Sequence, residues 1–329
     1  MPFLPDNIIN CLNNTYKPSS VKTYDSSIKR LHKLAGFPTT TFKPGVILKF
    51  NEMKNAMITN NVKLTSQITI VNAVNAICNC VDTFVLVKED YALLFAELVK
   101  QSKKHNKHRQ ATDDEKKHKL EWNEIIAKRD EYRRKYINSK TRTIDIAKAY
   151  RILMLMTEVA PLKGSEYIDM RIKKLTKREE KDIGRTCHLN GKNILCLRTS
   201  AMYVCEYGTV DRYGVKVIPF GKNVLKAIKQ TMRVLNPGSI TKINSSNMNH
   251  VLPVNIKLNT SITSSVFTNF MYRIFDPFKI STNAIRKAYT VQFLNKNPSH
   301  EERIFMAAVM GNSLDMQKHL LRRDKHERR

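Results

Sequence analysis

Apolar residues recur every three to four positions through much of the chain, a spacing typical of amphipathic helices. Residues 19–35 start with serines and carry apolar side chains on one helical face: Val21, Tyr24, Ile28, Leu31 and Leu34. The run GFPTTTFKPG ends this helix, and further helices are expected over 45–59, from 65–66 onward and over 90–104. Four short helices predict one small all-α domain, residues 1–104.

Helical and strand patterns alternate in the second part of the chain. Helices are expected over 120–136 and 143–159, in a short turn of APLKGSEYIDMRI, and along GKNVLKAIKQTMRVL. Strands are expected in KNILCLRTS and YGVKVIPF, where β-branched residues lie between turn residues. The chain should finish with helices over 261–275, 281–294, 300–310 and 313–323. The predicted fold class is mainly α with a small antiparallel β-sheet, the sheet belonging to a second domain, residues 120–329.

The best domain boundary is QSKKHNKHRQATDDEKKHK, residues 101–119, which lacks periodic apolar residues. We expect a basic linker over 105–119 and interpret its histidines as part of a solvated charge run rather than a metal site. We therefore predict neither a metal ion nor another cofactor.

The net charge is +28, from 57 Lys and Arg against 29 Asp and Glu. A charge of this size suggests a polyanionic partner, most simply nucleic acid. The alternatives are solubility and a lysine-rich codon bias in an AT-rich genome, such as that of a virus or mobile element.

The six cysteines form no CxxC pair and have no histidine at zinc-finger spacing. We interpret them as core or incidental thiols, which implies a reducing compartment. The first residues do not resemble a signal peptide, and no apolar run reaches about 18 residues. An intracellular protein without membrane contact is expected.

The order of elements resembles that of tyrosine recombinases, the phage integrase family. SSVKTYDSSIKRLHKLAGF is similar to the opening helix of that family and KLTSQITIVNAVNAI to its later groove-facing helix. The resemblance implies a helical, SAM-like core-binding domain and a catalytic-type domain that together clamp duplex DNA. In that family a tyrosine attacks the scissile phosphate, two arginines and a His or Trp neutralise its oxygens, and a hairpin lysine protonates the leaving group.

Most of this chemistry is replaced in the chain. By resemblance, Lys163 in APLKGSEYIDM occupies the place of the first arginine, followed by Ser165 and Glu166. A lysine keeps the charge but loses the bidentate fork that grips a phosphate. Counting back from VIP places the hairpin lysine at Asp211–Arg212, with Lys216 further along. Arginine is a poor proton donor, so no clean general acid is expected.

The second box corresponds to NAIRK. Asn283 stands for the first histidine, Arg286 is retained, and Lys287 stands for the second histidine. In VMGNSLDMQKHLL, Asn312 replaces the next histidine.

The position of the nucleophilic tyrosine falls on Leu321, and the sequence contains no tyrosine after Tyr289. Tyr289 is expected to pack in the core and His319 to lie on a surface helix, while Tyr167 and Tyr272 have no better claim to the role.

These observations favour a DNA-binding protein on a degenerate recombinase scaffold, with a packaging, architectural or junction-binding role. The expected DNA contacts are Lys22, Lys29, Arg30, Lys163, Arg212, Lys216, Arg286 and Lys287. Double-stranded DNA is the expected partner, with DNA junctions and homo-oligomers on DNA as further candidates, in the nucleus, nucleoid or viral DNA compartment. The alternatives are an active recombinase with a divergent site and an RNA-binding or protein-interaction module.

Overall fold

The computed structural model describes residues 2–108, 120–140, 142–185, 193–205, 214–236, 249–255 and 260–317. The chain divides into two units, Met1–Arg109 and Gln110–Arg329. Each unit has its own hydrophobic core, and each is described separately below.

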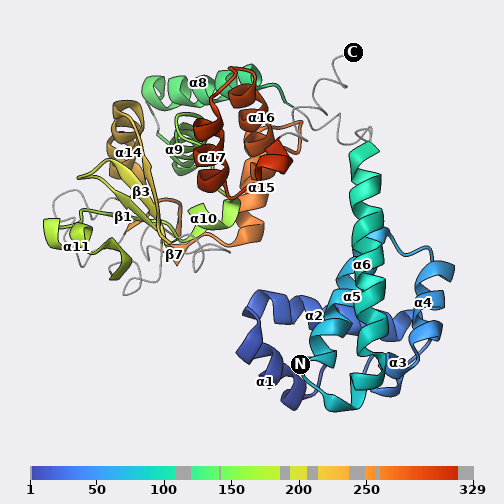
Figure 1. Cartoon of the computed structure of the whole chain (residues 1–329). Coiled ribbons are helices and arrows are strands. Elements are labelled where there is room, and N and C mark those ends of the chain that lie inside the picture. The colour runs from blue at the N-terminus through green and yellow to red at the C-terminus, as the bar shows by residue number, and fades with distance from the viewer. Residues whose placement is uncertain are drawn as a thin grey trace. The chain divides into compact units, whose positions relative to one another are not determined.

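Unit 1 consists only of helices (Figure 1), in the residues that the structure describes. They are α1 (Asp6–Thr15), α2 (Pro18–Leu34), α3 (Gly45–Leu48), α4 (Phe50–Thr59), α5 (Leu64–Cys78), the short 3-10 helix η1 (Asp82–Phe84) and α6 (Val85–His108). Pro18 sits in the first turn of α2, where its missing N–H costs nothing. Helix α5 lies between α2 and α6 and forms the centre of the core.

Three details of unit 1 differ from the prediction. Helix α1 was not expected, although Ile8 and Leu12 are four positions apart and are both buried. The predicted helix over 45–59 is broken at Lys49, whose φ and ψ of −89° and 60° are not helical. Helix α6 extends to His108, past the expected end at residue 104. Residues 109–119 of the predicted linker lie outside the described residues.

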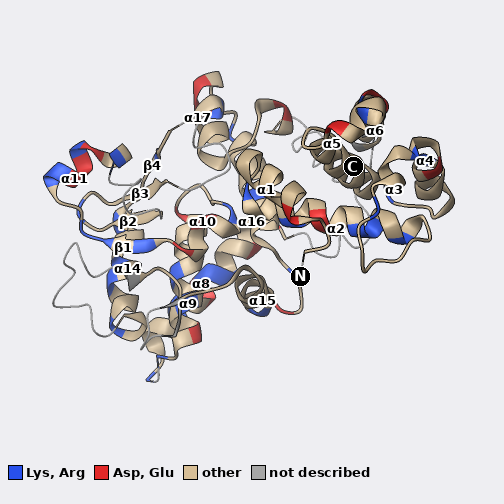
Figure 2. Cartoon of the chain, turned by 90° about the horizontal axis from the view of Figure 1, so that it is seen from below, with Lys and Arg blue, Asp and Glu red and all other residues tan. Residues whose placement is uncertain are grey.

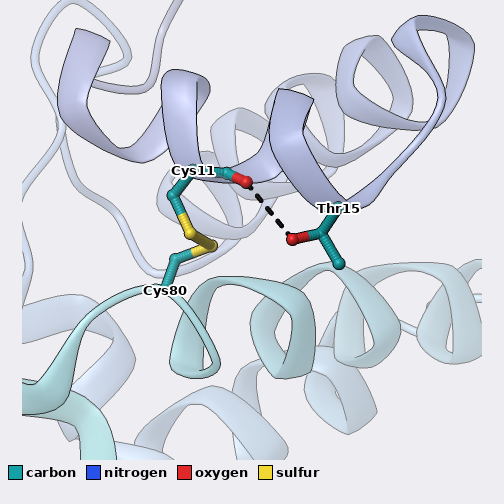
Figure 3. The surroundings of a disulfide bond; sticks show 3 residues. All are labelled: Cys11, Thr15 and Cys80. Atoms are coloured by element: carbon teal, nitrogen blue, oxygen red, sulfur yellow. Dashed lines mark hydrogen bonds between the residues drawn. A yellow bond between two sulfur atoms is a disulfide. The ribbon is translucent and has the colours of Figure 1, made fainter.

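A disulfide joins Cys11 of α1 to Cys80, which follows α5 (Figure 3), across a Cα–Cα distance of 5.8 Å. Cys205 is also disulfide-bonded. The interpretation of the cysteines as thiols is therefore wrong for these residues, and the inference of a reducing compartment loses its basis. Among the described residues, Cys78 and Cys196 are free and buried, as expected. Spacing along the chain carried no sign of the bond because packing, and not a motif, brings α1 to the end of α5.

Unit 2 combines helices with a small sheet. Its helices are α8 (Trp122–Asn138), α9 (Ile144–Thr157), α10 (Gly164–Ile168), α11 (Lys177–Lys181), α14 (Lys222–Leu235), α15 (Ser264–Ile274), α16 (Thr282–Leu294) and α17 (His300–Met310). Thr143, Thr263, Ser281 and Ser299 cap four of these helices through their hydroxyl groups. The first residues of the helix expected over 313–323 are helical from 314 to 317, and the remainder lies outside the described residues.

The sheet is mixed. Its strands are β1 (Arg171–Lys173), β2 (Ile194–Cys196), β3 (Ala201–Val204), β4 (Lys216–Pro219) and β5 (Asn249–His250), in the order β4-β3-β2-β1-β5. The mainly α class with a small sheet is confirmed, but β1 and β2 run parallel, whereas an antiparallel sheet was expected. Helix α11 lies in the connection between these two strands. A separate pair is formed by β6 (Pro253–Asn255) and β7 (Thr260–Ser261).

Helix α9 is the centre of unit 2, because every residue from Ala147 to Thr157 is buried. It packs against α8 and α14. Arg151 on this helix is fully buried, and the partners that the structure describes for its guanidinium are neutral. Its guanidinium donates to the Thr231 hydroxyl at 2.8 Å, to Asn236 Oδ1 at 3.1 Å and to the Val251 carbonyl at 2.8 Å. Burial lowers the pKa of Arg151 to about 9.

Replacing Arg151 with leucine should lower the free energy of unfolding of unit 2 by about 3 kcal/mol or more, because three buried acceptors lose their donor. Urea unfolding followed by circular dichroism measures this loss. Arg134→Leu, at an exposed position of α8, should change the free energy by about 0.5 kcal/mol at most. Equal midpoints for the two variants would contradict the structural role of Arg151.

Replacing Cys80 with alanine should lower the stability of unit 1 by about 2–4 kcal/mol, because the disulfide closes a loop with a sequence separation of 69. Amide hydrogen exchange in α1 and α5 reports this change locally. A thiol reductant should lower the protection of the native chain to that of the variant and leave the variant unchanged. If neither the Cys80→Ala change nor the reductant altered the exchange rates in α1 and α5, the disulfide would not stabilise unit 1.

Candidate functional site

Arg286 on α16 lies at the centre of the candidate site. It is 8% exposed, and its guanidinium donates to the Met310 carbonyl, to Asn312 Oδ1 at 3.3 Å and to Asn283 Oδ1 at 3.4 Å. Ser281 caps α16 by accepting the N–H of Ala284 and so fixes the start of this helix. The arginine therefore holds the turn that ends α17 against the first turn of α16.

Gly311 shapes this turn. It follows α17 with a φ of 62° and a ψ of 36°, the left-handed conformation that glycine adopts without steric cost. The position of a Cβ on Gly311 would be 3.5 Å from Lys216 Nζ and 4.0 Å from Lys163 Nζ. The two ammonium groups are therefore neighbours above the same turn.

Lys163 and Lys216 reach the turn from different elements. Lys163 precedes α10, and its backbone N–H donates to Glu166 Oε2 at 2.7 Å. Its side chain takes no part in this bond and is exposed. Lys216 begins β4 and is half-buried, and its Nζ donates to the Val309 carbonyl at 3.3 Å. We call Lys163, Lys216 and Arg286 the basic cluster.

Burial shifts the pKa of two members of the cluster, Lys216 and Arg286. It lowers the pKa of Lys216, which Lys163 and Arg286 lower further and Glu166 raises. Burial likewise lowers the pKa of Arg286, with Glu166 opposing the shift. Glu166 is itself 3% exposed. In the part of the chain that the structure describes, three cations thus lie near the carboxylate of Glu166, and a positive excess of this kind favours an anion.

The other predicted site residues are placed as follows. Asn283 and Asn312 lie beside Arg286 as its acceptors, whereas Lys287 is exposed on α16 and makes none of these contacts. Arg212 and Leu321 lie outside the described residues. The count along the sequence put the hairpin lysine at Asp211–Arg212, whereas the lysine that lies beside Lys163 at the turn is Lys216, which was expected only as a DNA contact. The alternation of β4 agrees with this position, because Lys216 shares a face with the buried Ile218.

Two described tyrosines of unit 2 that are close in sequence to cluster residues, Tyr167 and Tyr289, make contacts of their own. Tyr167 is fully buried, its hydroxyl accepts the Leu162 N–H at 3.0 Å, and burial raises its pKa. Tyr289 is half-buried and packs edge-on against Trp122, with ring centroids 5.2 Å apart. Neither hydroxyl resembles an exposed nucleophile.

Unit 1 carries two adjoining depressions between α2 and α5, which we call the hydroxyl groove. The first is lined by Lys22, Thr23, Ser26, Ser27, Arg30, Ser66, Thr69 and Ile70, and the second by Ser19, Ser20, Thr23, Tyr24, Ile68, Thr69, Asn72 and Phe95. Lys22 and Arg30, both predicted DNA contacts, thus lie together at its edge. Lys29 is exposed on α2 but is not part of this lining.

In the described part of the chain, no group of three or more His, Cys, Asp or Glu side chains could hold a metal ion. The described helices also include none that is both long and apolar enough to cross a membrane.

Comparison with known proteins gives little further information. No family model matches the chain, and no curated protein matches it. Among solved structures, the crystal structure of XerA recombinase matches with a TM-score of 0.39 and 10% sequence identity, covering 96% of this chain and 91% of that one. A match this weak does not show the family of the chain.

Replacing Gly311 with alanine should destabilise unit 2 by about 1 kcal/mol, because a Cβ disfavours the left-handed conformation. Gly221→Ala is the matched control, since Gly221 has a φ of −79° and open space around it. Thermal unfolding of both variants measures the difference. If Gly311→Ala were as stable as Gly221→Ala, the turn would not depend on the left-handed conformation.

Proposed function

We propose that the protein binds duplex DNA through backbone phosphates at the basic cluster and does not cut the strand. The observation that carries the proposal is the convergence of Lys163, Lys216 and Arg286 on one turn. The net charge of +28 supports a polyanion as the partner.

The cluster suits a phosphodiester for chemical reasons. Two lysine ammonium groups and a guanidinium can donate to the non-bridging oxygens from different directions. A bound phosphate would also offset the burial that lowers the pKa of Lys216 and Arg286, so binding and protonation would support each other. Such contacts give affinity and register but carry little sequence information.

Strand cleavage would need groups that the cluster lacks. Asn283 and Asn312 occupy the places of two catalytic histidines in the family that the sequence resembles. Both are neutral amides, which cannot take up or release a proton as a histidine does. Lys163 provides no bidentate fork. The loss of one transition-state donor costs about two to three orders of magnitude in rate. These replacements support a tyrosine-recombinase scaffold with a degenerate active site. An active recombinase is the alternative, and the gel experiment below must exclude it.

The hydroxyl groove is the second proposed DNA contact. Lys22 and Arg30 supply charge at its edge, while Thr23, Ser27 and Thr69 donate their hydroxyl protons to backbone carbonyls one turn earlier. Their oxygens remain available as acceptors. Figure 2 shows further Lys and Arg along α14, which carries four basic residues and no acidic one. A protein with these surfaces would act in a compartment that contains DNA, as a packaging, architectural or junction-binding factor, alone or as a homo-oligomer.

The test is one binding reaction with labelled duplex or nicked DNA, divided between native and denaturing gels. We expect a shift on the native gel that disappears on the denaturing gel, because the contacts are electrostatic. The logarithm of the affinity should fall linearly with the logarithm of the salt concentration. A band that survives denaturation would instead identify a covalent phospho-protein and an active enzyme.

Variants locate the contact. Lys163→Gln combined with Lys216→Gln should reduce the salt slope by about 2, one unit for each phosphate contact removed. Lys181→Gln, at an exposed position on α11, removes a charge without touching the cluster and should change the slope little. An equal effect of both changes would mean that the net charge, and not the cluster, binds the DNA.

A further inference from the structure

Helix α14 carries a row of cations on the face opposite its buried side. Its apolar residues Val224, Ile228 and Leu235 are buried in the core of unit 2. Its exposed cations recur at spacings of three or four residues, which keeps them on one helical face, and are Lys222, Lys226, Lys229 and Arg233. The helix contains no acidic residue. None of the four cations forms an ion pair with a residue that the structure describes.

The row continues beyond α14 through Arg142, which lies between α8 and α9. The Tyr136 hydroxyl of α8 donates to the Gln230 carbonyl at 2.7 Å and so joins α8 to α14. The exposed Arg142 guanidinium lies over the Tyr136 ring, 5.3 Å from its centroid. Burial raises the pKa of Tyr136, and Arg142 and Arg233 oppose this rise because both charges lie near the phenol. We call the four cations of α14 together with Arg142 the α14 face.

The α14 face is separate from the basic cluster. The cluster lies where α10, β4 and α16 begin, at the turn that ends α17. Helix α14 follows β4 but packs its apolar side on α9, so its cations point away from the core. Figures 1 and 2 both show α14 and α17 apart within unit 2. A phosphate group held at the cluster therefore does not contact the α14 face.

The chemistry of the α14 face fits the backbone of a nucleic acid duplex. From Lys222 to Arg233 the helix rises about 16 Å. Duplex DNA carries one negative charge per about 1.7 Å of its axis, so about ten phosphate charges lie within this length. All exposed residues of α14 are polar or charged, and the face thus lacks the apolar anchors of a protein interface.

We propose that the α14 face binds a second DNA duplex while the basic cluster holds the first, so that one molecule bridges two duplexes. This inference rests on the proposed DNA binding at the cluster. It specifies the architectural role, because a factor that joins two duplexes brings separate DNA segments together. The second set of contacts is again to phosphates, so it should depend on salt and carry little sequence information.

The experiment uses the full chain, a biotinylated duplex fixed on beads and a fluorescent duplex in solution. The fixed duplex retains the protein, and the fluorescence on the washed beads counts the second duplex captured per bound protein molecule. We expect capture that requires the protein and decreases as the salt concentration rises.

Charge variants locate the second contact. Capture per bound protein should fall by about tenfold or more in the α14 variant, because three phosphate contacts are removed. This variant carries Lys222→Gln, Lys226→Gln and Lys229→Gln. The matched control loses the same net charge at exposed positions on and beside α11 and should retain its capture. It carries Lys174→Gln, Lys177→Gln and Lys181→Gln.

A mixture of variants separates bridging by one molecule from bridging by an oligomer. The α14 variant keeps the cluster, and the double variant Lys163→Gln with Lys216→Gln keeps the α14 face. If one molecule needs both surfaces, an equal mixture captures as little second duplex as each variant alone. Capture restored by mixing would assign the bridge to an oligomer and overturn the proposal.

The outcomes distinguish bridging from DNA binding itself. Protein retained on the beads without a captured second duplex, or an equal loss in the α11 control, would overturn bridging and leave DNA binding standing. Capture of an RNA duplex or an acidic peptide in preference to DNA would also overturn the assignment of the α14 face. Absence of retention on any duplex would overturn both proposals. Capture lost in both site variants, kept in the control and not restored by mixing supports both.

Discussion

The arrangement of the candidate site depends on two hydrogen bonds that the buried Arg286 guanidinium donates, one to the Met310 carbonyl and one to Asn312. They join two helices that are separate in sequence, α16 and α17, at the turn around Gly311. Burying a guanidinium is costly unless its N–H groups are satisfied. The carbonyl at the end of α17 supplies an acceptor that no residue within that helix uses. The Arg286 guanidinium thus gives the terminal carbonyl of α17 a donor, and that carbonyl gives the buried guanidinium an acceptor.

The same turn collects charge from two further elements. Lys163 approaches because α10 begins at Gly164, where a Cβ would already lie 3.1 Å from the Thr282 hydroxyl oxygen at the start of α16. Lys216 approaches because the pairing of β4 with β3 fixes its face. Among the described residues, Glu166 offsets part of the mutual repulsion of these cations. Concentrated positive charge of this kind is stabilised by an anion, and this links the fold to the proposed function.

Unit 1 is held together by a helical core and a disulfide. Its core is made of short helices around α5, and Ile70, Val71, Val74 and Ile77 each expose 2% or less of their surface. The disulfide ties α1 to the end of this helix. Tyr16, which follows α1, packs edge-on against Tyr24 of the hydroxyl groove, with centroids 5.2 Å apart. The groove therefore rests on the same packing that the disulfide secures.

The sequence alone determined most helices, because apolar spacing reports which face of a helix is buried: α2, α5, α9, α14, α15, α16 and α17 lie close to where the pattern predicts them. It also marked Lys163, Arg286 and Asn312, through a resemblance carried by residue order. Only the tertiary structure decided the parallel pairing of β1 with β2, the position of Lys216 beside Gly311, and the bond between Cys11 and Cys80. Each of these depends on which distant elements pack together, and spacing along a chain reports a local face but no distant partner.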